Sequence, residues 1–211
     1  MARKAHKTTD QTRAQLIEAG KALFSEKGFD GTTVKEIANA AGVNISLISY
    51  HFDGKEKLYR ECVGDHGGKL LEMAKRILTH CKSEEEFKIR LRMFIDECFM
   101  DFVEDPELSL MAFREAEQMN QQNDPVLHAN YIRFFEKIIE FIKVGQSNGI
   151  AQTEIDPYIS AGVLFGGLSH FIKMNKIRET YFKKSIMEDA TRNQAAEHIT
   201  KIFLEGVLIK A

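Results

Sequence analysis

Residues 33–52, TVKEIANAAGVNISLISYHF, predict two short helices joined by a tight turn. Thr33 and Glu36 have the spacing of a capping box, in which each side chain accepts the backbone N–H of the other residue, so a helix begins here. Gly42 predicts the end of that helix, because glycine readily adopts the left-handed conformation found just after many helices. Asn44 can cap a second helix. The lengths of the two helices and the glycine between them are typical of a helix-turn-helix.

A longer helix is expected on each side of this pair. The second short helix, about residues 45–51, has only two turns, so Ile48 and Phe52 must hold it against its neighbours. The helix before the pair ends at Gly28. Its apolar stripe consists of Leu16, Ile17, Gly20, Leu23 and Phe24.

The helix after the pair begins near Lys55, where Asp53 can supply the N-cap. Gly64, Gly67 and Gly68 each weaken this helix by about 1 kcal/mol relative to alanine. We therefore expect a kink or fraying in its middle.

The remaining sequence keeps the helical period and contains no alternating β-branched run, so the expected fold class is all-α, with about nine helices. Ser83 and Glu86 again have capping-box spacing. Aspartate followed by proline is another start signal, because the carboxylate accepts free N–H groups and proline has none to leave unpaired. This pair occurs at Asp105-Pro106, Asp124-Pro125 and Asp156-Pro157 and predicts helices of about 106–119, 125–147 and 157–175, before a last helix of about 189–208.

The composition and charge of the chain exclude several classes of protein. The 211 residues carry a net charge of −2, so no global basic field draws the chain to nucleic acid or lipid, and such binding must be local. Residues 1–62 alone carry a net charge of +2. The longest apolar run, residues 159–172, is too short to span a bilayer, the N-terminus lacks a secretory signal, and the three cysteines have no CxxC spacing. We expect a cytoplasmic protein without a membrane partner.

The domain organisation follows from the distribution of apolar residues. Twelve of the fifteen phenylalanines lie after residue 86, so the larger core belongs to the back of the chain. We expect residues 1–54 to form a three-helix DNA-binding domain and residues 55–211 to form a second helical domain, with the fourth helix shared between them.

The second short helix would enter a major groove of DNA. Thr33 at a capped helix start, Lys35 beside it and Lys55 at the start of the next helix suit phosphate. Arg3, Lys4 and Lys7 form a basic arm that can reach an adjacent minor groove. The outward side chains of the helix, which offer hydroxyls, a ring and an apolar group to phosphates and base edges, are Ser46, Leu47, Ser49, Tyr50 and His51.

An ordered set of residues runs from position 16 to position 59. It consists of Leu16-Ile17-Glu18-Ala19, Phe24, Gly28-Phe29, Thr32-Thr33-Val34, Ile37-Ala38, Ala41-Gly42-Val43, Ile48, Tyr50-His51-Phe52, Lys55-Glu56 and Leu58-Tyr59. This set resembles the DNA-binding half of the TetR family of transcriptional regulators. The resemblance implies that Thr33 contacts phosphate, that Lys35 can reach a base and that Lys55 lies on the DNA backbone. Further base and phosphate contacts are implied for Leu47, Ser49, Tyr50 and His51.

Two positions depart from the family pattern. Ser49 stands where the family often has an aromatic residue, and Gly54 stands where it often has a serine or threonine cap. Asp53 can supply the cap that is missing at position 54. The binding mode is expected to be kept, while the DNA sequence that is recognised does not follow from the resemblance.

The same resemblance implies a pocket for a small-molecule effector in the back domain. Aromatic residues at helical spacing equally form ordinary core, and polar residues among them equally have structural hydrogen bonds. The candidate pocket residues are Phe94, Cys98, Phe102, Met111, Arg114, Tyr131, Phe134, Phe165 and His170.

A homodimer is also implied. Gly162 and Gly166 leave one face of their helix with little side chain, which permits close approach of another helix. Two helices from each subunit could form a four-helix interface around a two-fold axis, although packing within one chain would use the same faces. The candidate interface residues on the last helix are Ala196, Ile199, Phe203 and Val207.

The sequence offers no positive sign of catalysis, metal binding or a cofactor. Cys62 and His66 lie four residues apart on one helix face, a spacing that can hold a metal, but no third ligand is identifiable. No paired nucleophile and base, glycine-rich phosphate loop or HExxH motif is present.

The resulting hypothesis is a homodimeric, TetR-like regulator, most often a repressor, that binds a palindromic operator and is released by a small molecule. The fourth helix is the expected lever between the two domains, with its glycines setting where it bends. The alternative is a DNA-bound adaptor with the same front end, a protein partner and no effector. An adaptor would show an exposed apolar patch in the back domain and no change of DNA affinity with small molecules.

Overall fold

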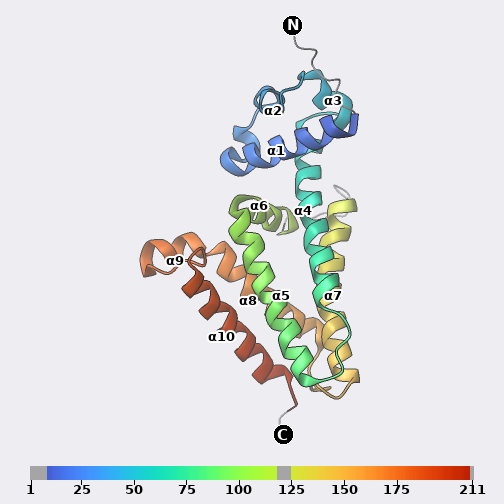
Figure 1. Ribbon diagram of the computed structural model, residues 1–211, viewed down its shortest axis with the longest axis vertical. Coiled ribbons are helices and arrows are strands. Elements are labelled where there is room, and N and C mark those ends of the chain that lie inside the picture. Colours follow the sequence, from blue (N-terminus) through green and yellow to red (C-terminus); the bar gives the residue numbers. More distant parts are fainter. Residues whose placement is uncertain (1–8, 118–124, 210–211) are drawn as a thin grey trace.

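The computed structural model describes residues 9–117 and 125–209, with side chains for residues 9–113 and 129–209. The described part forms a tall helical molecule with α1, α2 and α3 at one end and the end of α10 at the other (Figure 1). An isolated antiparallel bridge joins Ala151 to Leu208. The helices are α1 (Thr9–Gly31), α2 (Val34–Ala41), α3 (Ser46–Phe52), α4 (Lys55–Ile77), α5 (Glu84–Glu104), α6 (Pro106–Glu117), α7 (Pro125–Ser147), α8 (Pro157–Lys173), α9 (Asn175–Phe182) and α10 (Asp189–Val207).

The front core joins α1, α2 and α3 to the first half of α4. Ile48 and Phe52 of α3 are buried, as the sequence predicts for so short a helix. Gly28 lies at a break inside the α1 segment, with φ 73°. The core also contains Leu108 and Met111 of α6, so an element far along the chain packs directly on the end formed by α1, α2 and α3.

The back core is larger and richer in phenylalanine. It packs α5, α7, α8 and α10 with the second half of α4. The rings of Phe87 and Phe141 stack with their centroids 4.5 Å apart, joining the start of α5 to α7. The fully buried Phe94 and Phe99 continue this core along α5.

Most of the expected helix starts are confirmed. Ser83 accepts the N–H of Glu86 at 3.2 Å. Asp105 accepts the N–H of Leu108 at 3.0 Å, and Asp156 accepts that of Ile159 at 2.9 Å. Asp124 lies outside the described residues.

The expected cap at Asp53 is wrong. The N-cap of α4 is Gly54, which has no side chain to accept a hydrogen bond. The Asp53 carboxylate instead pairs with Lys57 at 2.7 Å. Asp53 itself is the C-cap of α3, in the left-handed conformation with φ 56°.

The short helix α9 was not expected, so the described residues contain ten helices. Its N-cap is Met174, which makes no side-chain capping hydrogen bond. Asn175 is its one buried residue, and its amide joins Ser185 and the N–H of Ile186 in the following loop. Tertiary hydrogen bonds therefore hold this helix in place, since its start has no local capping signal.

The expected kink in α4 is also absent, because the helix runs without a break from Lys55 to Ile77. The glycines instead allow α7 to lie close beside α4. A Cβ at Gly67 would lie 3.1 Å from Cε2 of Tyr131, and one at Gly68 would lie 3.6 Å from Nδ2 of Asn130. Asn130 also donates to the carbonyl of Gly64 at 3.3 Å.

Two alanine substitutions in α4 should therefore differ in their effect on the free energy of unfolding. A Cβ at Gly64 meets nothing within 4 Å, so Gly64→Ala should raise the free energy of unfolding by about 0.5–1 kcal/mol through helix propensity. Gly67→Ala should lose that gain, because Tyr131 must move by a few tenths of an ångström. Urea denaturation of both variants measures the difference, and equal stabilisation would show that α7 yields freely at this contact.

Candidate functional site

The turn between α2 and α3 has the geometry of a helix-turn-helix. The Thr33 N–H donates to Glu36 at 2.9 Å, and the Thr33 hydroxyl accepts the Glu36 N–H at 3.2 Å, which completes the predicted capping box. Gly42 has φ 65°, and its N–H donates to the carbonyl of Asn39 at 3.1 Å. Asn44 accepts the N–H of Ser46 at 2.9 Å, so its side chain caps the start of α3.

An ion pair fixes α2 against α1. Lys27 donates to Glu36 at 2.8 Å. This hydrogen bond, together with those from Thr33, lowers the pKa of Glu36 to about 2. The carboxylate therefore stays ionised at neutral pH and keeps the capping box closed.

The outer face of α3 is open at the end of the molecule that lies farthest from the end of α10 (Figure 1). Ser46 and Ser49 are exposed, Tyr50 is 73% exposed, and His51 is half-buried with its ring 4.9 Å from that of Tyr50. Leu47 is half-buried against the front core, which limits its reach.

Ile45, just before α3, is 47% exposed and was not singled out from the sequence. An exposed apolar side chain at the start of this helix suits a thymine methyl group. The only signal in the sequence was its position directly after Asn44.

The two candidate lysines differ. Lys35 is exposed beside Thr33. Lys55 is half-buried, and its ammonium donates to the carbonyls of Phe29 at 2.8 Å and Thr32 at 3.0 Å. It also lies 4.2 Å from the centre of the Phe29 ring. Lys55 therefore ties α4 to the loop between α1 and α2, and substituting it would act on this loop as well as on any contact with DNA.

The start of α4 offers backbone donors. Gly54 has φ 124° and no side-chain cap, so no side chain occupies the N–H groups of the first turn. Unpaired N–H groups at the positive end of a helix dipole suit a phosphate. Arg3, Lys4 and Lys7, the predicted basic arm, lie outside the described residues.

These elements define a helix-turn-helix protein whose second helix is exposed. Residues 16–62 match the family described as "Bacterial regulatory proteins, tetR family". Over this segment the front of the chain is similar to the TetR family of transcriptional regulators.

Three similar proteins illustrate the match. The chain is 38% identical over 78 residues to the probable HTH-type transcriptional regulator YttP of Bacillus subtilis. The matched segment covers 36% of this chain and 38% of YttP. It is 41% identical over 49 residues to the biofilm operon icaADBC negative transcriptional regulator IcaR of Staphylococcus epidermidis, which is 23% of this chain and 26% of IcaR. The matches therefore span well under half of these two relatives.

The third is a solved structure, SmeT, the repressor of the Stenotrophomonas maltophilia multidrug efflux pump SmeDEF. It has a TM-score of 0.69 and 17% identity, and the match covers 95% of this chain and 94% of SmeT. This likeness shows that the whole chain has the fold of such proteins. The relatives are regulators, and the prediction that this chain is not an enzyme agrees with them.

A small cavity of about 30 Å³ lies where α4, α5, α6, α7 and α8 meet. Four of the candidate pocket residues line it: Cys98, Tyr131, Phe134 and Phe165.

The other candidate pocket residues lie elsewhere. Phe94 and Phe102 are buried in the back core outside the lining, because they face other helices. Met111 belongs to the front core, since it lies on the face of α6 that points toward the DNA-binding end. His170 is exposed, and the side chain of Arg114 lies outside the described residues.

The sequence missed the polar corner of this cavity. His66 of α4, Asp101 of α5 and Ser109 of α6 line it together. His66 Nε2 lies 3.4 Å from Asp101 Oδ2, and the Ser109 hydroxyl donates to the same oxygen at 3.3 Å. Burial lowers the pKa of His66 to about 4 and raises the pKa of Asp101 to about 6. At neutral pH the corner thus holds a neutral imidazole and a carboxylate.

The candidate interface residues on α10 pack against the core of the same chain. Ala196, Phe203 and Val207 are buried in the core of the same chain, and Ile199 is half-buried against it. Ile199, Phe203 and Val207 also line a groove between α8 and α10. The apolar stripe of α10 faces α5 and α8, as core packing within one chain would also require.

Around this groove the two helices present exposed apolar side chains. Ile159 and Val163 of α8 are 64% and 65% exposed, and Ile202 of α10 is 70% exposed. These residues border the groove of about 350 Å³ between the two helices. Gly162 and Gly166 lie beside it on α8 with open space where a Cβ would stand.

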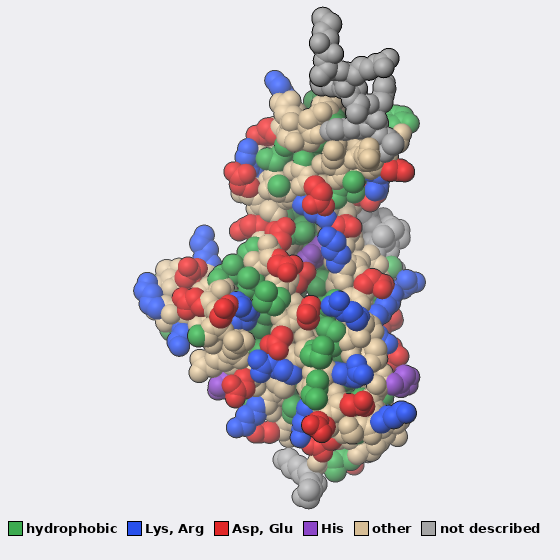
Figure 2. All heavy atoms as spheres, viewed as in Figure 1, with side chains coloured by type: hydrophobic (Ala, Val, Ile, Leu, Met, Phe, Trp, Pro, Cys, Tyr) green, Lys and Arg blue, Asp and Glu red, His purple; other side chains and the backbone are tan. Residues whose placement is uncertain are grey.

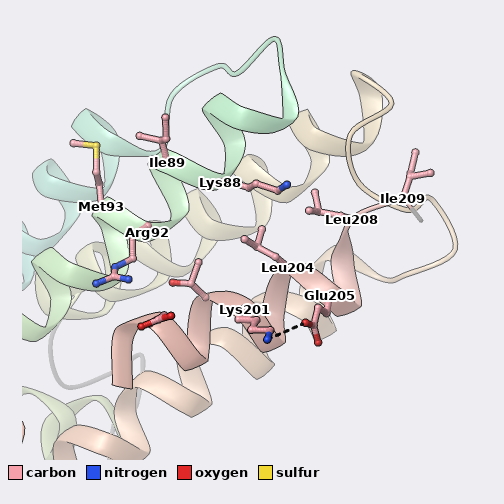
Figure 3. A pocket seen from close by; sticks show the side chains of 11 residues that line it. Lys88, Ile89, Arg92, Met93, Lys201, Leu204, Glu205, Leu208 and Ile209 are labelled. Carbon is pink, nitrogen blue, oxygen red and sulfur yellow. Dashed lines mark ion pairs between the residues drawn. The ribbon is translucent and has the colours of Figure 1, made fainter. Parts of the chain in front are cut away.

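A second groove of about 830 Å³ runs between α5 and α10 (Figure 3). Ile89 and Met93 of α5 are 52% and 50% exposed on one side, and Leu204 and Leu208 lie opposite. Charged groups border it, including Lys201, which pairs with Glu205. Hydrophobic side chains accordingly appear on the surface over α5 (Figure 2).

Cys62 and His66 do not act as a pair. Cys62 is buried against α1, where its thiol donates to the carbonyl of Ile17 at 3.5 Å and burial raises its pKa to about 12. His66 faces Asp101. Within residues 9–117 and 125–209, no three His, Cys, Asp or Glu side chains come together as a metal site, and no helix has the length and apolar character of a membrane span.

Proposed function

We propose that the chain is a cytoplasmic repressor that binds a palindromic operator as a homodimer and is released by a small-molecule effector. The observation that carries this proposal is the open face of α3, with Tyr50 outermost, between phosphate donors at the starts of α2 and α4. IcaR and SmeT are described as a negative regulator and a repressor, which supports the sign of regulation.

The homodimer would form through α8 and α10. Ile159, Val163 and Ile202 present a contiguous apolar face, and Gly162 and Gly166 permit close helix approach. Two such faces related by a two-fold axis form a self-complementary four-helix interface. A dimer of this kind carries one α3 from each subunit, as a palindromic site requires.

The cavity beside α4 and α6 is the proposed effector site. Ser109 and Phe113 of α6 line the cavity, while Leu108 and Met111 of the same helix pack in the front core. A molecule that enlarges the cavity must therefore displace a helix that contacts the DNA-binding end. The effector can shift the DNA-binding equilibrium only by its preference for the displaced state.

Selection from random duplex DNA tests the proposed function. The full-length chain should enrich a palindrome whose half-sites are centred roughly 10 base pairs apart or a multiple of that spacing. Selection of an asymmetric site would contradict binding by a two-fold dimer, and no enrichment at all would contradict sequence-specific binding. Flanking genes of matching genomic sites would then indicate candidate effectors.

The groove between α5 and α10 favours the adaptor as a second candidate function, because it is an exposed apolar surface in the back domain. The two functions differ in one measurement. A repressor of the proposed kind loses operator affinity when its effector binds, whereas an adaptor keeps the same operator affinity with every small molecule.

A further inference from the structure

The polar corner of the cavity has an unusual charge composition. Among the residues with described side chains that line the cavity, Asp101 is the only acid, and none is lysine or arginine. Its hydrogen-bond partners are the Ser109 hydroxyl at 3.3 Å and the His66 imidazole at 3.4 Å. Neither neutralises the carboxylate, because burial keeps His66 uncharged at neutral pH.

The charges around the cavity do not compensate either. Lys69 of α4 favours the ionised form of Asp101, but its ammonium lies 3.6 Å from Asp65 and it is exposed. Glu104 and Asp105 both disfavour ionisation of Asp101. A buried carboxylate in this setting is stabilised by an incoming cation and repels an incoming anion.

Aromatic rings form the rest of the wall. Phe165 lies 5.9 Å from Phe113 and 6.2 Å from Phe134, measured between ring centres, and Tyr131 completes the lining on α7. Rings of this kind attract a cation through their faces and accept an apolar body at the same time. Phe113 and Phe165 are only half-buried, so they form the outer side of the cavity.

On the basis of the proposed effector release, we propose that this cavity selects protonated amines with an apolar body, the ammonium group binding to Asp101 and the body lying among the rings of Phe113, Phe134 and Phe165. The present volume of about 30 Å³ admits one small group such as an ammonium. The apolar body requires Phe113 and Phe165 to turn outward, which also displaces α6.

Matched ligands test this selectivity. Benzyl, 4-phenylbutyl and octyl compounds, each as amine, alcohol and carboxylate, are titrated against the full-length chain by calorimetry at pH 7.5. The tightest amine should bind at least about tenfold more tightly than its alcohol, as one charge-assisted contact allows, and its carboxylate should bind more weakly than the alcohol.

The pH dependence has a definite sign. Because the amine binds the ionised form of Asp101, whose pKa is about 6, its affinity should be constant above that pH and fall about tenfold per unit below it. The alcohol needs no ionised partner and should lack this dependence.

Variants assign the effect to one side chain. Asp101→Asn should remove the preference for amine over alcohol, and Asp101→Glu should restore part of it. Asp96→Asn is the matched control, because Asp96 lies on the same helix but pairs with Arg92 on the surface. Circular dichroism verifies that each variant is folded. If Asp101→Asn does not fold, Ser109→Ala is used in its place and should weaken amine binding several-fold.

The outcomes separate the ligand class from the proposed function. Tighter binding of a carboxylate or an alcohol, an amine preference that survives Asp101→Asn, or no binding by any amine would overturn the proposed selectivity. A carboxylate that binds the cavity and releases the chain from DNA would overturn the amine selectivity but support effector release. An Asp101-dependent amine that binds but leaves operator affinity unchanged would support the ligand class and contradict effector release.

Discussion

Ile202→Arg should separate the dimer into monomers and lower operator affinity by roughly 10²–10⁴-fold, because each subunit then binds its half-site alone. Ile202 is 70% exposed at the centre of the α8–α10 face, across the groove from Ile159 and Val163. In a two-fold dimer one substitution introduces two charges into an apolar interface, and the described residues that line this groove include no acid. Light scattering measures the mass, and a binding titration with operator DNA measures the affinity.

Ile89→Arg is the matched control. Ile89 is also an exposed isoleucine, at 52%, but it lies on α5 in the other groove. This variant should remain dimeric and bind the operator as the unsubstituted chain does. If Ile89→Arg separates the dimer and Ile202→Arg does not, the subunits meet at the α5–α10 groove and the proposed face is wrong.

Tyr50→Ala should weaken binding to the selected operator by about 1–3 kcal/mol, roughly 10- to 100-fold, while random DNA is bound nearly as before. Tyr50 is the most exposed large side chain of α3, at 73%, and no core residue depends on it. Its loss removes a base-edge contact and leaves the phosphate contacts in place. Titrations with operator and random duplexes at several salt concentrations measure both effects.

Two other variants complete this comparison. Lys35→Ala should weaken all duplexes alike and reduce the slope of log affinity against log salt by about one, because an exposed lysine at a helix start neutralises one phosphate. Tyr181→Ala is the control, since Tyr181 is 75% exposed on α9, away from the DNA-binding end. If Lys35→Ala changes sequence preference as much as Tyr50→Ala does, Lys35 reads a base instead.

Local signals in the sequence were sufficient for the front of the molecule. Thr33, Gly42 and Asn44 act on backbone groups within a few residues of themselves, so their spacing already determines where α2 and α3 begin and end. The same holds for Asp156, which caps α8 through the N–H of Ile159. Helix α9 lacks such a signal, and its Asn175 depends on a loop ten residues further along the chain.

The sequence did not predict those features of the sites that depend on how the helices pack against one another. The apolar period of α10 identifies a buried face but does not tell whether the surface that covers it belongs to the same chain. Phe203 packs in the core of its own chain and also lines the groove between α8 and α10. The distance between His66 and Asp101 along the chain gives no sign that α4 and α5 bring them within 3.4 Å. Lys55 has the charge of a phosphate ligand, yet two carbonyls nearby already bind its ammonium.

The close packing of α4 on α7 bears on the construction of chimeric biosensors. The first half of α4 contributes Leu58 and Val63 to the front core, and the second half contributes Leu71 and Ala74 to the back core. A chimera joined at residue 54 would therefore replace the helix-turn-helix domain but not the first half of α4, on which that domain packs. A joint after Val63 and before Gly67 would keep the first half of α4 with the helix-turn-helix domain. The contact between Gly67 and Tyr131 would then stay within the back domain.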